Sequence, residues 1–522
     1  MKRLPLGIQT FSKLILDNHY YVDKTEFIYK LAQKGTYFFL SRPRRFGKSS
    51  FLDTLREAYS GNEDLFRGLF LEKNWDWSKK HPVIHISFGS GIMQSRREVV
   101  EKIDWVLQNN QQQLEVSCTS KNLSNCFFEL IQNAYEKYNQ KVVVLIDEYD
   151  KPILDNIEKN ILPYQIREIL KGFYGVIKDS DRYIQFVFIT GVSKFSKVNL
   201  FSGLNNLLDI TLDPKFATIC GYTELELQTT FGDILQDVPL EELREWYNGY
   251  NFLGEKVYNP YDVLNYLDRR VFKNYWFETG TPSFLLKLIE KRKFSIPNLE
   301  SVELSEELVN SFDINSIELE TLLFQTGYLT IREVESLGDM LIYHLCYPNK
   351  EVKKSLNDYI LTYLSHLATQ KEKNKSQLYK ALYAGELDKL KNLFHSFFAS
   401  IPYNWYTNNK IASYEGFYSS IVYTYFTAIG LEVKVEDSTN NGRIDLVAFL
   451  NGRCYILEFK VNELTSGERA LEQLKEKKYY EKYVNYKPQY LASGVIKEIY
   501  LVGVEFSKAD RNITAFEWER VL

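Results

Sequence analysis

Residues 37–50 read YFFLSRPRRFGKSS, and this stretch decides the fold of the first part of the chain. It opens with a short apolar run typical of a buried strand, and the residues after it have a helical pattern. The loop between them ends in Gly47, Lys48 and Ser49. Strand, loop, Gly-Lys-Ser and helix are the arrangement of a phosphate-binding loop, whose backbone N–H groups and helix N-terminus hold phosphates. We therefore expect Lys48 to reach the β- and γ-phosphate oxygens and the Ser49 hydroxyl to bind Mg²⁺.

The loop departs from the general pattern G-x-x-x-x-G-K-[ST] at its first position. That position is Arg42, and Pro43 follows it. A bare Gly-Lys-Ser after a basic turn is common by chance, so the stretch alone leaves an ordinary turn open. Arg44 and Arg45 are candidates for phosphate contact and equally for surface charges that flank a turn.

A second motif, VVVLIDE at residues 142–148, supports the phosphate-binding interpretation. A continuous apolar run that ends in two acids is typical of a parallel strand buried on both faces, whose carboxyl end meets the ligand. In this Walker B arrangement Asp147 is expected to hold Mg²⁺ through water, and Glu148 to polarise the attacking water. The alternative is a core strand that stops at two exposed acids.

Two further runs, residues 82–88 and 183–190, have the length and apolar content of neighbouring strands. Helical stretches separate the four runs, so the first part of the chain is predicted to form β/α units in a parallel sheet, which is an α/β fold. Thr190 ends the last run and would lie near the γ-phosphate as a sensor. The motifs together favour an ATPase.

Four short motifs resemble those of bacterial AAA-ATPase-like proteins that carry a C-terminal PD-(D/E)XK nuclease domain. They are YYVDKT at 20–25, RPRRFGKS at 42–49, DEYD at 147–150 and TGVS at 190–193. In that family RPRRFGKS is the usual phosphate loop, so the resemblance implies ATP and Mg²⁺ as ligands. The residues it assigns to ATP binding are Arg44, Arg45, Phe46, Gly47, Lys48, Ser49, Ser50, Asp147 and Thr190. The missing first glycine leaves the rate of ATP hydrolysis open.

A different chemistry is expected near the other end of the chain, where two apolar strands flank Asn451-Gly452. This dipeptide is the one best suited to a two-residue type I′ hairpin turn. Such a turn would place Asp445 opposite Glu458, with Lys460 on the same face and an apolar opposite face. Paired carboxylates repel each other unless a cation lies between them, and oxygen ligands suit Mg²⁺ or Mn²⁺.

The alternative is a surface hairpin without a metal, in which Arg443 neutralises Asp445 and Lys460 neutralises Glu458. Further residues weigh against it, because their order resembles the PD-(D/E)XK nuclease superfamily over about the last quarter of the chain. They are Glu415 on a predicted helix at 413–426 and Gln473 on a predicted helix at 468–483. The resemblance implies that Asp445 and Glu458 hold the metal and that Lys460 positions the attacking water. It also implies that Glu415 assists and that Gln473 supports the site or the strand, although a glutamine on a charged helix is ordinarily only solvent-facing.

The 522 residues are enough for about three domains. We predict an AAA-like P-loop core at 1–220, a helical lid or winged-helix-like region at 221–345, a helical connector at 346–400 and a PD-(D/E)XK nuclease-like domain at 401–522. The resemblance implies the lid. Its aromatic clusters can stack nucleic-acid bases, but more often such clusters form the core of a small helical domain.

The composition limits the possible partners. The formal net charge of −4 excludes a protein that binds duplex nucleic acid by bulk electrostatics, so a nuclease here would need a local basic rim. Five cysteines without C-x-x-C spacing and six histidines without paired spacing indicate neither a zinc site nor a disulfide framework. The sequence has no signal core and no run of membrane-spanning length, so we expect a cytoplasmic protein without membrane contact.

These observations predict an ATP-binding and ATP-hydrolysing protein whose nucleotide state controls a Mg²⁺-dependent phosphodiesterase. The expected substrate is nucleic acid, with DNA favoured over RNA, and defence against foreign DNA is a role suggested by analogy alone. AAA-like ATPases often complete their sites between subunits, so a homo-oligomer is an open expectation. Two alternatives remain: a nucleotide-dependent switch or scaffold with a catalytically weak nuclease-like domain, and a DNA-remodelling ATPase.

Overall fold

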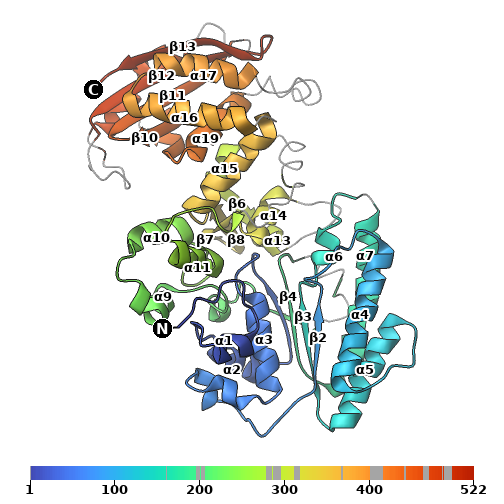
Figure 1. The fold of residues 1–522 in the computed structure, drawn as a ribbon. Helices are drawn as coiled ribbons and strands as arrows, with labels where there is room; N and C mark the ends of the chain where they lie inside the picture. Colours follow the sequence, from blue (N-terminus) through green and yellow to red (C-terminus); the bar gives the residue numbers. More distant parts are fainter. Residues whose placement is uncertain are drawn as a thin grey trace. The chain divides into compact units, whose positions relative to one another are not determined.

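The computed structural model describes residues 2–159, 161–194, 200–201, 206–277, 285, 296–310, 318–365, 368–399, 415–439, 442–462, 469–484, 486 and 496–522. It divides into two compact units (Figure 1). The first comprises Met1–Thr279 and Val302–Lys350, and the second comprises Gly280–Ser301 and Glu351–Leu522. The four-part division from the sequence is finer than these two units and stays a prediction.

The first unit is built on a five-stranded parallel sheet with the order β2-β3-β4-β1-β5. Its strands are β1 (Tyr37–Ser41), β2 (Val83–Ser87), β3 (Val142–Asp147), β4 (Ile184–Gly191) and β5 (Leu208–Asp209). The four strands expected from the apolar runs are therefore confirmed, and β5 is an additional short one. β1 and β3 are buried along their whole length, as continuous apolar runs require in a sheet covered on both faces.

Helices cover both faces of this sheet, with α3 on one side and α4 and α5 on the other (Figure 1). The helices are α1 (Phe11–Leu16), α2 (Thr25–Lys34), α3 (Lys48–Tyr59), α4 (Arg96–Leu114), α5 (Leu123–Tyr138), α6 (Lys151–Leu154) and α7 (Leu162–Asp179). Side-chain caps fix the starts of the two long helices on one face: Ser95 accepts from the N–H of Glu98, and Asn122 accepts from two N–H groups of α5. The sheet thus presents its carboxyl edge, where the predicted motifs lie, on a rigid support.

The rest of the first unit begins with three helices, α9 (Glu224–Phe231), α10 (Leu240–Tyr247) and α11 (Pro260–Arg269). An antiparallel sheet of order β6-β8-β7 follows, made of β6 (Val302–Ser305), β7 (Thr330–Leu337) and β8 (Met340–Cys346). Two short helices, α13 (Glu306–Asn310) and α14 (Leu319–Thr326), lie between β6 and the hairpin. The helices expected in this region are therefore present, and its role as a lid or winged-helix-like part stays a prediction.

The aromatic clusters of this region form its core. Trp246, Tyr247, Tyr258 and Tyr275 are buried together with apolar side chains of α9, α10 and α11. Rings also stack within the cluster, as Trp246 does on Phe272 with centroids 5.7 Å apart. These side chains are therefore core residues and do not offer faces for nucleic-acid bases.

The second unit contains a five-stranded mixed sheet of order β13-β12-β11-β10-β9. Only the β11–β12 pair is parallel. The strands are β9 (Glu432–Thr439), β10 (Gly442–Leu450), β11 (Arg453–Val461), β12 (Glu498–Ser507) and β13 (Asn512–Arg520). The helices are α15 (Lys350–Ser365), α16 (Ala368–Ala384), α17 (Asp388–Ala399), α19 (Glu415–Ala428) and α20 (Ala470–Lys477), and the 3-10 helices are η7 (Ile296–Glu300) and η9 (Tyr479–Tyr483).

The helices predicted for the connector pack within this second unit. The Tyr455 hydroxyl of β11 donates to the carbonyl of Leu382 in α16, and the Trp518 indole of β13 donates to Asp388 of α17 at 2.9 Å. The rings of Phe398 in α17 and Tyr418 in α19 meet Phe506 of β12. These helices therefore close one face of the sheet, while α20 and η9 close the other.

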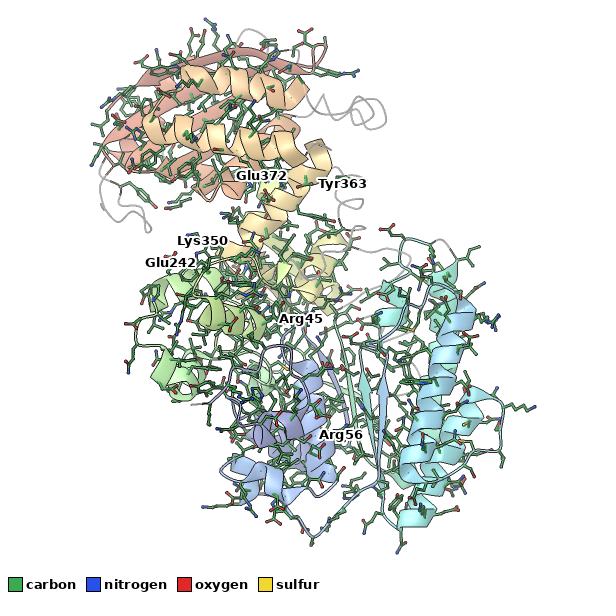
Figure 2. All side chains as sticks on the ribbon, in the orientation of Figure 1. Arg45, Arg56, Glu242, Lys350, Tyr363 and Glu372 are labelled. Carbon is green, nitrogen blue, oxygen red and sulfur yellow. The ribbon has the colours of Figure 1, made fainter. Side chains whose placement is uncertain are left out.

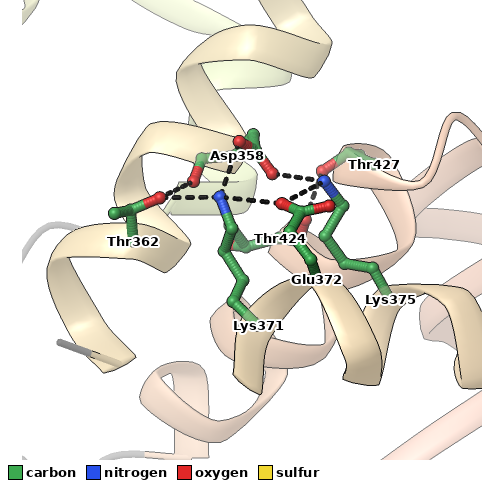
Figure 3. Close-up of polar contacts among 7 residues, drawn as sticks. All are labelled: Asp358, Thr362, Lys371, Glu372, Lys375, Thr424 and Thr427. Atoms are coloured by element: carbon green, nitrogen blue, oxygen red, sulfur yellow. Dashed lines mark hydrogen bonds and ion pairs between the residues drawn. The ribbon is translucent and has the colours of Figure 1, made fainter. Parts of the chain in front are cut away.

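A partly buried ion cluster joins two of these helices (Figure 3). The Asp358 carboxylate of α15 accepts from the ammonium groups of Lys371 and Lys375 in α16, at 2.8 and 2.6 Å. Lys371 also donates to the Thr362 hydroxyl at 2.8 Å, and Lys375 contacts Glu372. Burial raises the pKa of Asp358, but the two lysines outweigh it and the pKa is lowered. The cluster therefore ties α15 to α16 by charge as well as by packing.

Candidate functional site

The phosphate loop of the first unit turns into α3 through a left-handed glycine. Gly47 has φ 93° and precedes Lys48, the first residue of α3. The Lys48 ammonium is buried and donates to the carbonyls of Arg42 and Pro43, each at 2.9 Å. Burial lowers the pKa of Lys48, whereas Asp147 and Glu148 act in the opposite direction. The lysine therefore spans the loop where phosphate oxygens are expected.

Arg42 explains why the loop needs no glycine at its first position. Its φ is not in the left-handed region, so a side chain is allowed there. The guanidinium is fully buried and donates to the carbonyls of Ser41, Thr211 and Phe216, and it lies 3.9 Å above the Phe252 ring. Burial lowers the pKa of Arg42 to about 10. This residue fixes the base of the loop.

The remaining residues predicted to bind nucleotide lie around Lys48. Arg44 and Arg45 are exposed, and Figure 2 labels Arg45. The Arg45 guanidinium lies 5.1 Å from the Tyr261 ring centroid. Phe46 is buried edge-on against Tyr250 and acts as packing rather than as a polar ligand. Ser50 lies in the first turn of α3 and is partly buried.

Two oxygens suited to Mg²⁺ meet at the ends of α3 and β3. The Ser49 hydroxyl donates to Asp147 Oδ2 at 2.6 Å. Asp147 Oδ1 is buried and has no hydrogen-bond partner among the described residues. Burial raises the pKa of Asp147, and Ser49 and Lys48 lower it. A hydroxyl beside a carboxylate with a spare oxygen fits the hard-ligand preference of Mg²⁺.

Thr190 and Glu148 lie at the same sheet edge. β4 runs between β3 and β1, and Thr190 pairs with Leu40 of β1. The Thr190 hydroxyl oxygen is buried without a hydrogen-bond partner in the described part of the chain. Glu148 is half-buried and has φ 51°, a conformation that is strained for a non-glycine residue. The edge therefore brings together Lys48, Ser49, Asp147, Glu148 and Thr190.

A clamp that the sequence did not reveal fixes this edge. The buried Asp150 carboxylate accepts from the N–H groups of Val192 and Ser193, at 3.1 and 2.7 Å, and from the Ser193 hydroxyl at 2.6 Å. A Cβ at Gly191 would lie 2.5 Å from the Asp150 carboxylate, so only glycine fits there. The DEYD and TGVS motifs thus contact each other through Asp150 and Ser193. The only sequence signal for this contact was that each motif directly follows a predicted strand.

In the second unit the predicted hairpin is confirmed. Asn451 and Gly452 have φ 50° and 77°, as a type I′ turn requires, and Leu450 pairs with Arg453. The register continues to Leu446 opposite Leu457, so Asp445 and Glu458 are next in line. β10 and β11 are both interior strands, so the surface placement in the alternative is wrong. The pairing of Lys460 with Glu458 that it expected is present, and metal binding stays a prediction.

Asp445 lies against the partner strand. Its carboxylate accepts from the backbone N–H of Phe459 at 2.8 Å. Burial raises the pKa of Asp445, whereas this hydrogen bond and the Lys460 ammonium lower it. Arg443, the expected partner of Asp445 in the surface hairpin, is exposed and forms its ion pair with Glu436 at 3.0 Å.

Glu458 is buried, with 3% of its surface exposed. It accepts a hydrogen bond from the Gln473 side chain of α20, and the Lys460 ammonium lies 3.8 Å from the same carboxylate oxygen. Gln473 reaches it because Glu458 pairs with Gly503 of β12, where a Cβ would lie 2.4 Å from the Leu471 backbone nitrogen. The structure therefore brings Asp445, Glu458, Lys460 and Gln473 together, and Gln473 is not merely solvent-facing.

Tyr479 belongs to this site and was missed in the sequence. A Cβ at Gly442 would lie 2.6 Å from its hydroxyl. Burial raises the pKa of Tyr479, and so do the nearby Glu458 and Asp445, while Gln473 lowers it by a hydrogen bond. The available signal was a tyrosine on the buried side of the same helical segment as Gln473.

Glu415 begins α19, and its side chain lies outside the described residues. Within the described part of the chain, no three histidine, cysteine, aspartate or glutamate side chains cluster as a metal-holding group.

No helix among the described residues is long and apolar enough to cross a membrane.

Comparison with known proteins identifies both units. Residues 5–201 match the family model described as predicted AAA-ATPase, and residues 413–516 match the PD-(D/E)XK nuclease superfamily. An uncharacterized protein in the vnfD 5′ region of Azotobacter chroococcum mcd 1 is 49% identical over 517 residues, covering 99% of this chain and 98% of that protein. No solved structure matches. The chain therefore belongs to the family of predicted AAA-ATPases that carry a C-terminal domain of the PD-(D/E)XK nuclease superfamily.

Proposed function

We propose that this protein binds and hydrolyses ATP in its first unit and that its nucleotide state controls a Mg²⁺-dependent phosphodiesterase in its second unit. DNA is the first candidate substrate and RNA the second. One observation carries the nuclease half: the carboxylate of Glu458 is buried beside Lys460 and Gln473. With Asp445 on the neighbouring strand, this carboxylate supplies the hard oxygen ligands that Mg²⁺ prefers, and the Lys460 ammonium beside it can orient a water.

In the first unit, Lys48 would exchange the carbonyls of Arg42 and Pro43 for phosphate oxygens, because a doubly charged phosphate is the stronger acceptor. Ser49 and Asp147 would hold Mg²⁺ through the oxygens that now meet at 2.6 Å. Glu148 would accept the proton of the water that attacks the γ-phosphate. Thr190 would donate to the same phosphate and report its loss.

In the second unit, Asp445 and Glu458 would hold Mg²⁺, with Mn²⁺ as a substitute. The ion would neutralise charge on the scissile phosphate and lower the pKa of its bound water. Lys460 would orient this water towards phosphorus, and Gln473 would keep the Glu458 carboxylate in position by its hydrogen bond. The P–O bond to the leaving strand would break as the new P–O bond forms.

Defence against foreign DNA is the cellular role we propose from the pairing of the two units. Phage challenge of cells that carry the protein or its Glu458→Gln variant tests this role. Equal survival of both would refute it.

The contacts of Lys48 favour a second candidate function, a nucleotide-dependent switch without strong cleavage. Since Lys48 binds the carbonyls of its own loop, nucleotide entry requires a local rearrangement, which is what a switch needs. The net charge of −4 agrees with this candidate, because it gives little general attraction for nucleic acid.

One experiment separates the two candidates. Single- and double-stranded DNA are incubated with purified protein in Mg²⁺ or Mn²⁺, with and without ATP. Glu458→Gln removes the proposed metal ligand, and Glu517→Gln is the matched control, because Glu517 is an exposed carboxylate of β13 in the same sheet. Cleavage lost only in Glu458→Gln supports the nuclease, and ATP dependence lost in Lys48→Ala supports the coupling. No cleavage under any condition would favour the switch.

A further inference from the structure

Several contacts of the phosphate loop come from residues that follow the parallel sheet in the chain, in addition to the hydrogen bond from the Arg42 N–H to the Gly191 carbonyl of β4 at 3.2 Å. Gly221 N–H donates to the Phe46 carbonyl at 3.2 Å, and Tyr261 lies under the Arg45 guanidinium. The Trp276 indole N–H donates to the Arg44 carbonyl at 3.0 Å. Within the loop, Lys48 donates to the carbonyls of Arg42 and Pro43, and Arg42 donates to the carbonyl of Ser41. The loop conformation therefore depends on residues far away in sequence.

The turn after α14 reaches the loop from the same region. Gly327 has φ 92°, and a Cβ built on it would lie 2.6 Å from the Pro43 side chain and 3.5 Å from the Trp276 ring. Trp276 in turn meets the Tyr328 ring, with centroids 5.3 Å apart. Trp276, Gly327 and Tyr328 thus form one packed surface against the phosphate loop.

The same helix also reaches the other side of the ATP site. Gln325 of α14 is buried, and its side-chain oxygen accepts from the backbone N–H of Lys194 at 2.8 Å. Lys194 follows the turn after β4 that Asp150 clamps, four residues beyond Thr190. The Gln325 amide nitrogen donates to the Val309 carbonyl at 3.4 Å, which fixes the orientation of the amide. One short helix therefore contacts both the phosphate loop and the segment after the proposed sensor strand.

We propose that Trp276 and Gln325 are positioning residues of the nucleotide site, which set its affinity by holding the backbone at Arg44 and Lys194. This inference rests on the proposed ATP binding. The hydrogen bonds do not touch nucleotide; they limit the positions that the loop and the β4 turn can take. Coupling of this kind is reciprocal. If the position of α14 changes the affinity for nucleotide, bound nucleotide must also change the position or stability of α14.

The first test is Trp276→Phe, which removes the indole N–H but keeps an aromatic ring against Tyr328. Binding of a non-hydrolysable ATP analogue with Mg²⁺ is measured by calorimetry on the full chain. Loss of one hydrogen bond that fixes the loop is expected to weaken binding roughly threefold to tenfold. Trp246→Phe is the matched control, since Trp246 is buried in the aromatic core of the same region. It should leave the affinity unchanged.

The second test uses two glycines with similar backbone conformations. Gly327→Ala pushes on Pro43, whereas Gly338→Ala in the β7–β8 turn has φ 62° and nothing within 4 Å. Both variants are destabilised by an alanine with positive φ, but only Gly327→Ala should also weaken nucleotide binding. Gln325→Met, which keeps the side-chain length and removes the amide, should weaken it as well. Unfolding temperatures without nucleotide separate an effect on affinity from one on folding.

The outcomes distinguish this inference from the proposed function. Wild-type protein that binds no nucleotide would refute ATP binding and this inference with it. Wild-type binding together with equal affinities for Trp276→Phe and Trp246→Phe would refute the inference alone. A Gln325→Met variant that unfolds earlier but, when folded, binds nucleotide as tightly as wild type would show a structural role only and would also count against it.

Discussion

Gly503→Ala should disable the proposed nuclease site without replacing any of its polar groups. A Cβ at Gly503 would lie 2.4 Å from the Leu471 nitrogen and 2.9 Å from its Cα, and both atoms belong to the backbone of α20. Ordinary contact begins at 3.4 Å, so α20 must withdraw by about 1 Å. Gln473 moves with the helix, and its hydrogen bond to Glu458 is stretched or broken.

Two magnitudes follow from this displacement. Overpacking of this kind costs about 1–3 kcal/mol of folding stability. Misplacement of a supporting group by 1 Å costs on the order of 10²-fold in rate. We therefore expect the second unit to remain folded, with α20 less protected from hydrogen exchange and DNA cleavage reduced by roughly two orders of magnitude.

Two comparison variants isolate the cause. Gln473→Ala removes the same hydrogen bond without moving α20, so its cleavage rate should fall between those of wild type and Gly503→Ala. Gly430→Ala introduces backbone strain alone, because Gly430 has φ 87° and a Cβ built on it would have no atom within 4 Å. This variant should cleave DNA like wild type. A Gly503→Ala protein that loses protection in α20 yet cleaves at the wild-type rate would refute the reasoning.

Three further predictions concern other sites. Asp147→Asn should weaken Mg²⁺-nucleotide binding roughly tenfold or more. It should also raise the unfolding temperature of the nucleotide-free protein at pH 7, because burial raises the pKa of Asp147 and the charged carboxylate therefore destabilises the fold above the unfolded pKa. A lower unfolding temperature would contradict this reasoning. Asp358→Asn should cost about 1–3 kcal/mol in urea denaturation at pH 7, since Lys371 and Lys375 lose their negatively charged acceptor. The pKa of Asp358 is lowered in the folded state, so its stabilising contribution is present above the unfolded pKa of about 4 and is lost as the pH falls through the folded pKa. A loss of stability in Asp358→Asn that stays the same in acid would contradict this assignment. Tyr479→Phe removes one hydroxyl beside Gly442 and should slow DNA cleavage with little change in stability, whereas equal rates would remove Tyr479 from the site.

Local sequence was sufficient where local geometry decides the structure. The Asn451-Gly452 turn fixes its own backbone conformation, and the alternation of the strands then places the paired residues from Leu450 back to Leu446. Beyond them the alternation fails, since Ile444 packs in one cluster with Val447 and Phe449. The runs before Arg42 and up to Asp147 are buried on both faces, so their length and composition predict parallel strands. The placement of Lys48 and Ser49 follows from the same strand-to-helix connection.

Contacts between distant segments could not be predicted. Arg42 departs from the general motif because it binds carbonyls of residues 211 and 216, and nothing in its neighbourhood in sequence indicates that partner. Gln473 reaches Glu458 only because a glycine on another strand lets α20 approach. The Asp150 clamp likewise needs the adjacency of β3 and β4, which the apolar runs predict in general but not residue by residue.

The contacts that hold the phosphate loop determine how long a fragment of this protein must be to bind nucleotide. The family model for the ATPase ends at residue 201, yet the loop is held by Thr211, Phe216, Gly221, Tyr261, Trp276 and Gly327. A fragment cut at residue 201 would keep every motif and lose every one of these supports. The nucleotide-binding module therefore includes the residues that contact its loop. A fragment meant to bind ATP must extend to about residue 350, where the first compact unit ends.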